Sequence, residues 1–330
     1  MLDTLWCGLG GTVPMARSYQ KPWLSYRDQC NLLSSRGLEV TDASFATEVL
    51  RHVQYYRFSG YCLAFETSRH VFLPGTRFED VVAAYEFDRH LRRLLSTALE
   101  WIEIDFRTAV AHEFAGIYGP FGHLHSRNFF PKFSHPEWIE QCRKSAEKSR
   151  ERFVEHYREE YDGFPDLPIW VVTELLSFGD VSRLYKGLLR KDQTKIAGKY
   201  ARQPHELISW MHHLVYMRNV CAHFARVWDR VHAVTPIRPH AIVWNSHVIP
   251  DSSRLFMTML VLAAMLNQIP LLGPKVATWR QQIEHYIENK RPRLSHANEL
   301  MGLTDDWNNH PVWQAAHKTP TPRSPDHGQE

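Results

Sequence analysis

The sequence predicts an all-α protein, and three observations support this fold class. Apolar residues recur at helical spacing along most of the 330 residues, whereas the alternation typical of strands is weak. Capping residues precede several of the helical runs. Hydrophobic residues make up 44% of the chain, which is enough for a sizeable core, and no internal repeat or linker divides it. One large helical domain is therefore expected.

Helical runs follow one another along the chain, separated by caps or turn residues. Ser25 and Asp42 stand where the N-caps of the first two helices belong, and Pro136 stands in the first turn of a later helix. An apolar helix is expected to end at Gly179, and Asp180 is the expected cap of the next one. The helices are expected at about 26–36, 43–53, 78–117, 136–161, 169–179, 181–189, 205–230, 251–267 and 273–289.

Three stretches between these helices are expected to be less regular. The aromatic stretch 55–66 is interpreted as a packed turn or a short helix, and residues 70–78 as an extended connection. Residues 120–135 are rich in Pro, Gly, His and Phe, which is typical of a loop.

The domain boundaries follow from composition. Residues 1–14 are expected to be a leader, either disordered or the result of a misassigned start, because Met15 is a second candidate start. A single domain is expected over 15–300, with N-terminal helices over 20–120 and a bundle over 136–290. Residues 301–330 are expected to be a polar, Pro-rich tail whose last part is disordered.

Cysteine usage and apolar runs bear on compartment. The five cysteines are scattered and without a CxxC motif, which argues against a disulfide framework or a Cys-based zinc site and favours a reducing cytoplasm. The start of the chain lacks a basic region and a long apolar run, so no signal peptide is expected. The longest apolar run, 255–266, is too short to span a bilayer and is interpreted as a buried helix. No membrane association is expected.

The segment YMRNVCAHFARVWDR, residues 216–230, carries the main candidate site. On a helix its apolar and polar residues form two opposed stripes. The apolar stripe consists of Leu214, Met217, Cys221, Phe224 and Trp228. The polar stripe consists of His212, Asn219, His223, Arg226 and Arg230, with Arg218 close enough to lean toward it.

Histidine and arginine together suit the cleavage of RNA without a metal. A base must remove the 2′-hydroxyl proton, an acid must assist the leaving 5′-oxygen, and a cation must stabilise charge on the phosphorane. Imidazole serves either proton role and guanidinium matches a phosphate. The alternative is a solvated face, or one paired with acids of a neighbouring helix. The bare Arg–His spacing also recurs at Arg107 and His112, where Glu103 is expected to pair with Arg107 and to make that match structural.

The same segment resembles the RN-x-x-AH motif of HEPN-domain ribonucleases, and the chain resembles the Abi-like abortive-infection proteins of the AbiD and AbiF type. The resemblance extends in order over about residues 20–290, through KPWLSYRDQCNLLSSRGL, LRHVQYYRFSGYCLAF, the long 85–112 segment and PIWVVTELLSFGDVSRLYKGL. It implies a HEPN-like helical bundle with additional N-terminal helices. It also implies that Arg218 and His223 are the catalytic pair, that Asn219 is the polar residue after the Arg, and that Arg226 is an accessory basic position.

The resemblance further implies a homodimer, because HEPN domains usually place two motifs at a shared cleft. Arg218 and His223 are about 140° apart around one straight helix, so that two copies would supply the set more easily than one. One His would act as base and one as acid, leaving a cyclic phosphate and a 5′-hydroxyl. A phage-defence toxin held in check by a regulatory RNA or an antitoxin partner is the expected role.

Other charged residues offer further candidate sites. The stretch 183–202 is strongly basic and would contact an RNA backbone, or else form a solvated face. Its expected RNA-binding residues are Arg183, Lys186, Arg190, Lys191 and Lys195, together with Arg226, Arg230 and His212 on the next helix. The pairs His123/His125 and His212/His213 are interpreted as surface histidines, because no carboxylate or Cys set accompanies them, and no metal or other cofactor is expected.

Two rival functions remain open at the level of sequence. A non-catalytic HEPN module would use the same basic surfaces to hold RNA without cutting it. A partner-binding scaffold would use the apolar helices 251–289 as its surface. Neither rival requires an Arg and a His together, which favours the enzyme.

Overall fold

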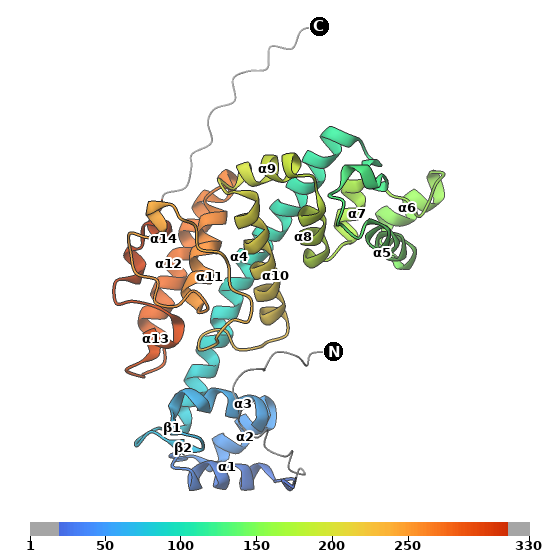
Figure 1. Cartoon of the computed structure of the whole chain (residues 1–330). Helices are drawn as coiled ribbons and strands as arrows, with labels where there is room; N and C mark the ends of the chain where they lie inside the picture. Colours follow the sequence, from blue (N-terminus) through green and yellow to red (C-terminus); the bar gives the residue numbers. More distant parts are fainter. Residues whose placement is uncertain (1–19, 316–330) are drawn as a thin grey trace, which may run out of the picture. The chain divides into compact units, whose positions relative to one another are not determined.

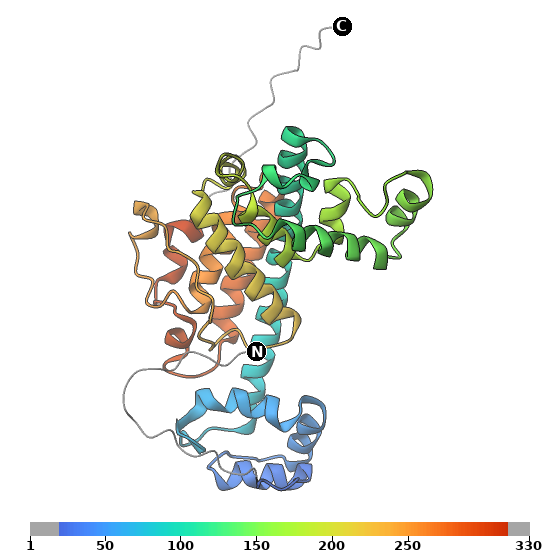
Figure 2. The same cartoon turned by 45° about the vertical axis from the view of Figure 1, so that its right-hand side comes forward.

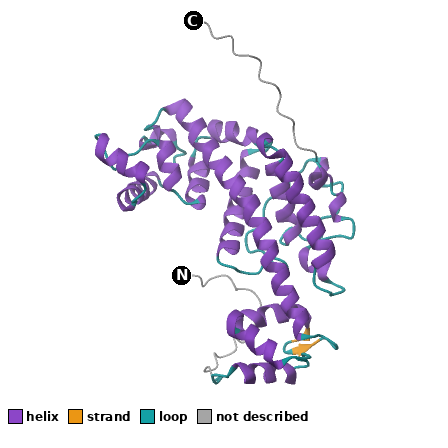
Figure 3. Ribbon diagram, turned by 180° about the vertical axis from the view of Figure 1, so that it is seen from behind, coloured by secondary structure: helices purple, strands orange, loops and turns teal. Residues whose placement is uncertain are grey.

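The computed structural model describes residues 20–315 (Figure 1). Among these residues the regular structure consists of 14 α-helices, several single 3₁₀ turns and one two-stranded sheet, so the expected all-α class is confirmed. Figure 3 shows how little strand the chain contains. The leader expected over 1–14 and the last part of the expected tail, 316–330, lie outside the described residues.

The chain divides into two compact units, one ending at Phe78 and the other beginning at Glu79, and the sequence does not indicate this division. The first unit holds α1 (Tyr26–Ser35), α2 (Ala43–Val53), α3 (Tyr55–Cys62), β1 (Glu66–Ser68) and β2 (Val71–Phe72). Both expected caps are confirmed: Ser25 Oγ accepts from the Asp28 N–H at 3.2 Å and Asp42 Oδ1 from the Phe45 N–H at 2.9 Å.

The second unit is built on α4 (Phe78–Tyr118), a helix of 41 residues. Its end is the one expected from sequence, because Gly119 follows with a φ of +75° and its N–H returns to the Ala115 carbonyl at 2.8 Å. Some residues of α4 lie in the core of this unit and others are exposed, so the helix contributes residues to several sites.

The helix expected over 136–161 is two helices, α5 (His135–Lys148) and α6 (Arg152–Glu160). Ser149 separates them in an extended conformation, and its hydroxyl accepts from the Glu151 N–H at 3.2 Å. Serine offers the backbone such a local alternative to the helical hydrogen bond, which explains the interruption.

The helix end expected at Gly179 is also wrong: the helix ends four residues earlier, at Leu175, and the next N-cap lies three residues earlier than expected, at Ser177. α7 (Ile169–Leu175) has Leu176 as its C-cap, and Ser177 rather than Asp180 is the N-cap of α8 (Phe178–Gly187), accepting from the Asp180 N–H at 3.2 Å. Gly179 therefore lies in the first turn of α8. α9 (Arg190–Lys199) follows after a short connection.

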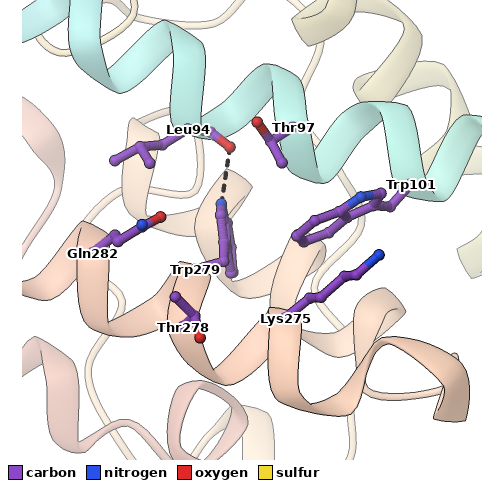
Figure 4. Close-up of a pocket in the computed structure, with 7 residues that line it drawn as sticks. All are labelled: Leu94, Thr97, Trp101, Lys275, Thr278, Trp279 and Gln282. Atoms are coloured by element: carbon purple, nitrogen blue, oxygen red, sulfur yellow. Dashed lines mark hydrogen bonds between the residues drawn. The ribbon is translucent and has the colours of Figure 1, made fainter.

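The core of the second unit lies among α4, α10 (Pro204–Ala222), α11 (Leu255–Leu266) and α12 (Gly273–Lys290), which run side by side (Figure 2). All twelve residues of α11 are buried, as its apolar composition predicted. The Trp279 indole donates to the Leu94 carbonyl at 2.8 Å and fastens α12 to α4 beside a small pocket (Figure 4). Because α11 is fully buried, it offers no apolar surface to a partner, which counts against a scaffold role for this helix.

The fold continues past residue 300, the limit expected from sequence. α13 (Ala297–Met301) is followed by α14 (Pro311–Gln314), which packs against α11. Trp307 and Trp313 are both buried there, and their rings are 5.5 Å apart. Residues 301–315 therefore complete the core.

Within the described chain no single helix is both long enough and apolar enough to cross a membrane. The stretches Leu255–Leu266 and Pro270–Lys290 reach that length and apolar character together but are bent by 109°. Cys30, Cys62, Cys142 and Cys221 are buried and none of the four is in a disulfide, and Cys7 lies outside the described residues.

Candidate functional site

The candidate site begins where α10 ends. The helix stops at Ala222, well before Arg230, where the sequence placed its end. The Phe224 N–H donates to the Cys221 carbonyl and the Ala225 N–H to the Val220 carbonyl, both at 3.0 Å. These two bonds form a Schellman motif, which normally has glycine at the position that Phe224 occupies.

Phe224 has a φ of +56°, a left-handed conformation that is strained for a bulky residue. Its ring is 65% exposed instead of lying in the core, as the apolar stripe predicted. Arg226 and Arg230 lie beyond the helix, so the continuous polar stripe expected from sequence is also wrong. Both differences arise because the helix ends in a sharp turn at His223 and Phe224. Since neither residue is a glycine, the sequence does not indicate this turn.

A buried ion pair on α4 holds the chain that follows this turn. Asp88 Oδ1 accepts from the N–H groups of Val227 and Trp228, each at 2.9 Å. Its other oxygen pairs with Arg92, whose Nη1 also lies 3.4 Å from the Ala225 carbonyl. Both side chains are buried, so α4 anchors the backbone immediately after His223.

Sequence reasoning missed Asp88 and Arg92. Their spacing of four residues is that of an intrahelical ion pair, which is usually a surface feature. The apolar residues Phe87 and Leu91 beside them were a signal that this pair is buried. Their partners at 225–228 could not be inferred from any local pattern.

His223 stands at the C-cap position of α10, and its backbone N–H bonds to the Asn219 carbonyl at 3.0 Å. Its side chain is exposed, and across residues 20–315 its imidazole has no hydrogen-bond or ion-pair partner. Both ring nitrogens are therefore available to a ligand.

Arg218 points toward α4. Its Nε lies 3.5 Å from Glu103 Oε2, and its Nη1 lies 3.5 Å from Asn219 Oδ1. The Arg218 side chain is 42% exposed, whereas that of Glu103 is 14% exposed. Because these contacts are long and the guanidinium is half open to solvent, Arg218 retains capacity for an anion.

Glu103 joins two arginines. Its Oε1 pairs with Arg107 Nη2 at 2.9 Å, which confirms the pair expected from sequence, and the same Nη2 donates to the Leu176 carbonyl at 3.2 Å. Arg107 and Arg218 thus share one carboxylate, so Arg107 contributes charge next to the candidate catalytic arginine. His112, the other half of that second match, is exposed further along α4.

A pocket of about 510 Å³ lies over this ion network. It is lined by Ser96, Leu99, Glu100, Glu103, Ile104, Arg107, Arg218 and Ala222. Ala222 is the residue next to His223, but His223 itself does not line the pocket. One copy of the chain therefore gathers Arg218 with Arg107 and leaves His223 outside the lining of this pocket.

The remaining candidates on and after α10 have separate surroundings. His212 is exposed on the helix. Arg226 pairs with Asp229 Oδ2 at 2.9 Å, and burial raises the pKa of Asp229 to about 6. Arg230 donates from Nε to the Tyr216 hydroxyl at 3.0 Å, with its guanidinium 6.0 Å from the ring centroid. Arg226 and Arg230 are thus half-buried and already engaged.

The expected RNA-binding residues on α8 and α9 are all exposed. Lys195 and Lys199 both bond the Glu113 carboxylate, at 2.7 and 2.9 Å, and lower its pKa to about 2. Arg183 pairs with Asp180, and the Lys191 ammonium lies 5.7 Å from the Tyr118 ring centroid. In the part of the chain that the structure covers, Lys186 and Arg190 carry no ion pair, so they are the freest cations here.

The interpretation of the histidine pairs as surface residues is wrong for His123 and His213. Both are buried, and desolvation lowers the pKa of each to about 4. His213 Nδ1 lies 2.7 Å from the Val234 carbonyl and its Nε2 2.9 Å from Thr258 Oγ1. A histidine can be buried in a core when its ring nitrogens have polar partners. The sequence does not show which residues those partners are, so it does not indicate this burial.

Comparison with known proteins gives one family. A model described as Abi-like protein matches residues 48–229, which run from α2 through α10 to Asp229 and include the Asp88–Arg92 pair, Glu103, Arg218 and His223. No curated protein and no solved structure gives a significant match.

Proposed function

The chain belongs to the Abi-like protein family, and from this premise we propose that it is a HEPN-type endoribonuclease that acts in abortive infection, a form of phage defence. The family match covers the segment that carries Arg218 and His223. The proposal concerns the chemistry of that segment and its assembly as a homodimer.

The observation that carries the proposal is the exposed, unpartnered imidazole of His223, which directly follows Ala222 in the lining of the pocket that holds Arg218. A surface histidine is usually free to move with its helix, but here the following backbone is pinned to Asp88. A positioned imidazole beside a guanidinium is the set that phosphodiester cleavage uses.

The reaction divides among two copies of the site. The imidazole of His223 in one copy removes the proton of the 2′-hydroxyl, and the 2′-oxygen attacks phosphorus. The imidazolium of the second copy donates its proton to the 5′-oxygen as the P–O5′ bond breaks. The products are a 2′,3′-cyclic phosphate and a 5′-hydroxyl, and the proton count balances between the two histidines.

Arg218, with the positive charge of Arg107 next to it, stabilises the negative charge that develops on the phosphorane oxygens. A phosphate competes with Glu103 for the Arg218 guanidinium, and the long 3.5 Å contact is readily given up. Glu103 retains its partner Arg107 when Arg218 turns to the phosphate. Glu103 is thus a positioning residue. It orients the Arg218 side chain but leaves the guanidinium enough positive charge to bind a phosphate.

We predict that purified protein cleaves single-stranded RNA in the presence of EDTA. His223→Ala should lower the rate by at least about a hundredfold, because a general base or acid contributes on the order of 10²–10⁴. Cleavage is followed with labelled RNA, and the end groups are identified by their response to phosphatase and to kinase.

His205→Ala is the matched control, because His205 is another exposed histidine on α10 and should leave the rate unchanged. Full cleavage by both His223→Ala and Arg218→Ala would disprove the assignment. RNA that is bound but not cut by the wild-type protein would instead identify a non-catalytic HEPN module.

A further inference from the structure

A second pocket, of about 530 Å³, lies on α5, α8 and the loop before α5, and the proposed cleavage mechanism does not use it. It is lined by Phe130, Lys132, Phe133, Ser134, Glu137, Trp138, Gln141, Arg183, Lys186 and Gly187. We refer to it as the aromatic pocket. Its volume is that of an ordinary small-molecule site.

The aromatic wall of this pocket is rigidly built. Phe130 donates its N–H to the Gly187 carbonyl and accepts at its own carbonyl from the Phe133 N–H, both at 2.8 Å. An isolated antiparallel bridge joins Phe129 to Leu188, and the rings of Phe129 and Phe133 stack at 5.1 Å. The loop is thereby fastened to the end of α8.

Gly187 explains how close this approach is. A Cβ at that position would lie 2.4 Å from the Phe133 ring, a distance that no side chain tolerates. Glycine is required here because another element packs directly on its backbone. The Phe133 ring therefore lies directly against the backbone of α8.

Cations surround this wall. Lys132 and Lys186 are exposed, and neither has an ion-pair partner within residues 20–315. Arg183 is held by Asp180, and Glu137 is the one acid in the lining. The pocket therefore favours an anionic ligand.

Two further features of the lining are available to a ligand: an exposed aromatic ring and a buried hydrogen-bond donor. The Phe130 ring is 51% exposed. The Trp138 indole N–H is buried and has no acceptor among the described residues, which is uncommon for a buried donor. Exposed aromatic surface next to free lysines is the pairing that nucleotides use, because the base stacks and the phosphate binds the cation.

We propose that the aromatic pocket binds one unpaired nucleotide. Its base stacks on the exposed ring of Phe130, next to Phe133, and its phosphate bonds Lys132 and Lys186. Either an RNA strand or a free nucleotide could supply this chemistry. The strand form rests on the proposed function, and it places a base-binding site on α8, the helix that packs against α10 (Figure 1).

The test measures binding rather than cleavage. The full-length His223→Ala protein is titrated with AMP, with ribose 5-phosphate and with a fluorescent five-nucleotide RNA at fixed salt. AMP should bind more tightly than ribose 5-phosphate, because only AMP carries a base. Phe130→Ala should weaken AMP by about tenfold, since stacking on an aromatic side chain has a contribution of that order.

Matched variants separate this pocket from general effects. Phe130→Tyr keeps an aromatic ring at this position and, unlike Phe130→Ala, should leave the affinity for AMP unchanged. Lys186→Ala should weaken AMP, whereas Lys275→Ala removes the same charge from the pocket of Figure 4 and should have no effect. Phe153→Ala removes a similarly exposed ring from α6 and is the aromatic control. Circular dichroism of each variant establishes that the fold is intact.

The outcomes distinguish the two sources. AMP that is displaced by the RNA identifies a nucleotide of the strand, and AMP that stays bound alongside the RNA identifies a free nucleotide. Equal affinity for AMP and ribose 5-phosphate, or affinities unchanged by both Phe130→Ala and Lys186→Ala, would overturn the proposal. Because no cleavage is measured, binding here with an inactive wild-type protein would retain this site while rejecting the nuclease.

Discussion

At the scale of single residues, the turn at His223 and Phe224 is the feature that most separates this chain from an ordinary helix end. A left-handed conformation costs a non-glycine residue roughly 1–2 kcal/mol. Such strain persists where the surrounding structure imposes it, and it is concentrated at functional sites. Here the two carbonyls of α10 and the Asp88 anchor impose it, and the exposed imidazole is its neighbour.

We predict that Phe224→Gly stabilises the protein by about 0.5–1 kcal/mol, since glycine relieves the strain but also gains freedom in the unfolded chain. Urea unfolding at constant slope measures the change. Cleavage should nevertheless fall, because glycine loosens the turn that presents His223.

Ala201→Gly is the matched control for this prediction. Ala201 has a φ of +51° in the corresponding Schellman motif after α9, away from His223. It should gain stability without any change in cleavage. Loss of stability in Phe224→Gly would show that the ring packs more than its exposure indicates.

At the scale of elements, the long helices could be predicted and several of their ends could not. α4 has apolar residues at helical spacing along its length and is closed by a Gly-Pro pair, and α11 is almost wholly apolar. The break at Ser149 and the end at Ala222 depend on local hydrogen bonds made without glycine. Sequence patterns therefore locate these elements better than they delimit them.

The candidate site was only partly predictable for a related reason. Arg218 and His223 lie in one short motif, so a resemblance could find them. Glu103, by contrast, meets Arg218 from another helix, and the pairing of Asp88 with residues 227 and 228 spans well over a hundred residues. Contacts of that range leave no periodic signal in the sequence.

The anchor between α4 and the chain after α10 gives a prediction at this scale. Asp88→Asn should destabilise the protein by roughly 3–5 kcal/mol, because it leaves the buried Arg92 charge without its counter-ion. Arg92→Met should also destabilise it, since the Asp88 carboxylate then remains buried without the positive charge of Arg92. Chemical denaturation of both variants measures these costs.

The double variant Asp88→Asn/Arg92→Met tests whether the cost is electrostatic. It should be less destabilised than the sum of the two single variants, since no charge is then left buried. Additive effects would mean that the two side chains act through packing and not as an ion pair.

At the scale of the whole molecule, one copy of the chain does not supply all the groups that the proposed mechanism requires. His223 does not line the pocket that holds Arg218, and the chemistry requires two proton-transferring groups. A two-fold axis that brings two α10 ends together supplies both imidazoles to one phosphodiester. On this hypothesis the active species is a homodimer, and its activity depends on both copies of His223.

We predict that wild-type protein and His223→Ala form mixed dimers without activity. When equal amounts are mixed and allowed to exchange, about one quarter of the dimers are wild type in both copies, so the activity should fall to about one quarter of that of the wild-type protein alone. Light scattering gives the assembly state, and co-purification through a tag on one variant establishes that exchange has occurred. Activity that falls only to the share of wild-type chains, or that persists in a monomer at high dilution, would mean that each copy cuts alone. In that case the general acid would be another group of the same chain and not the second copy of His223.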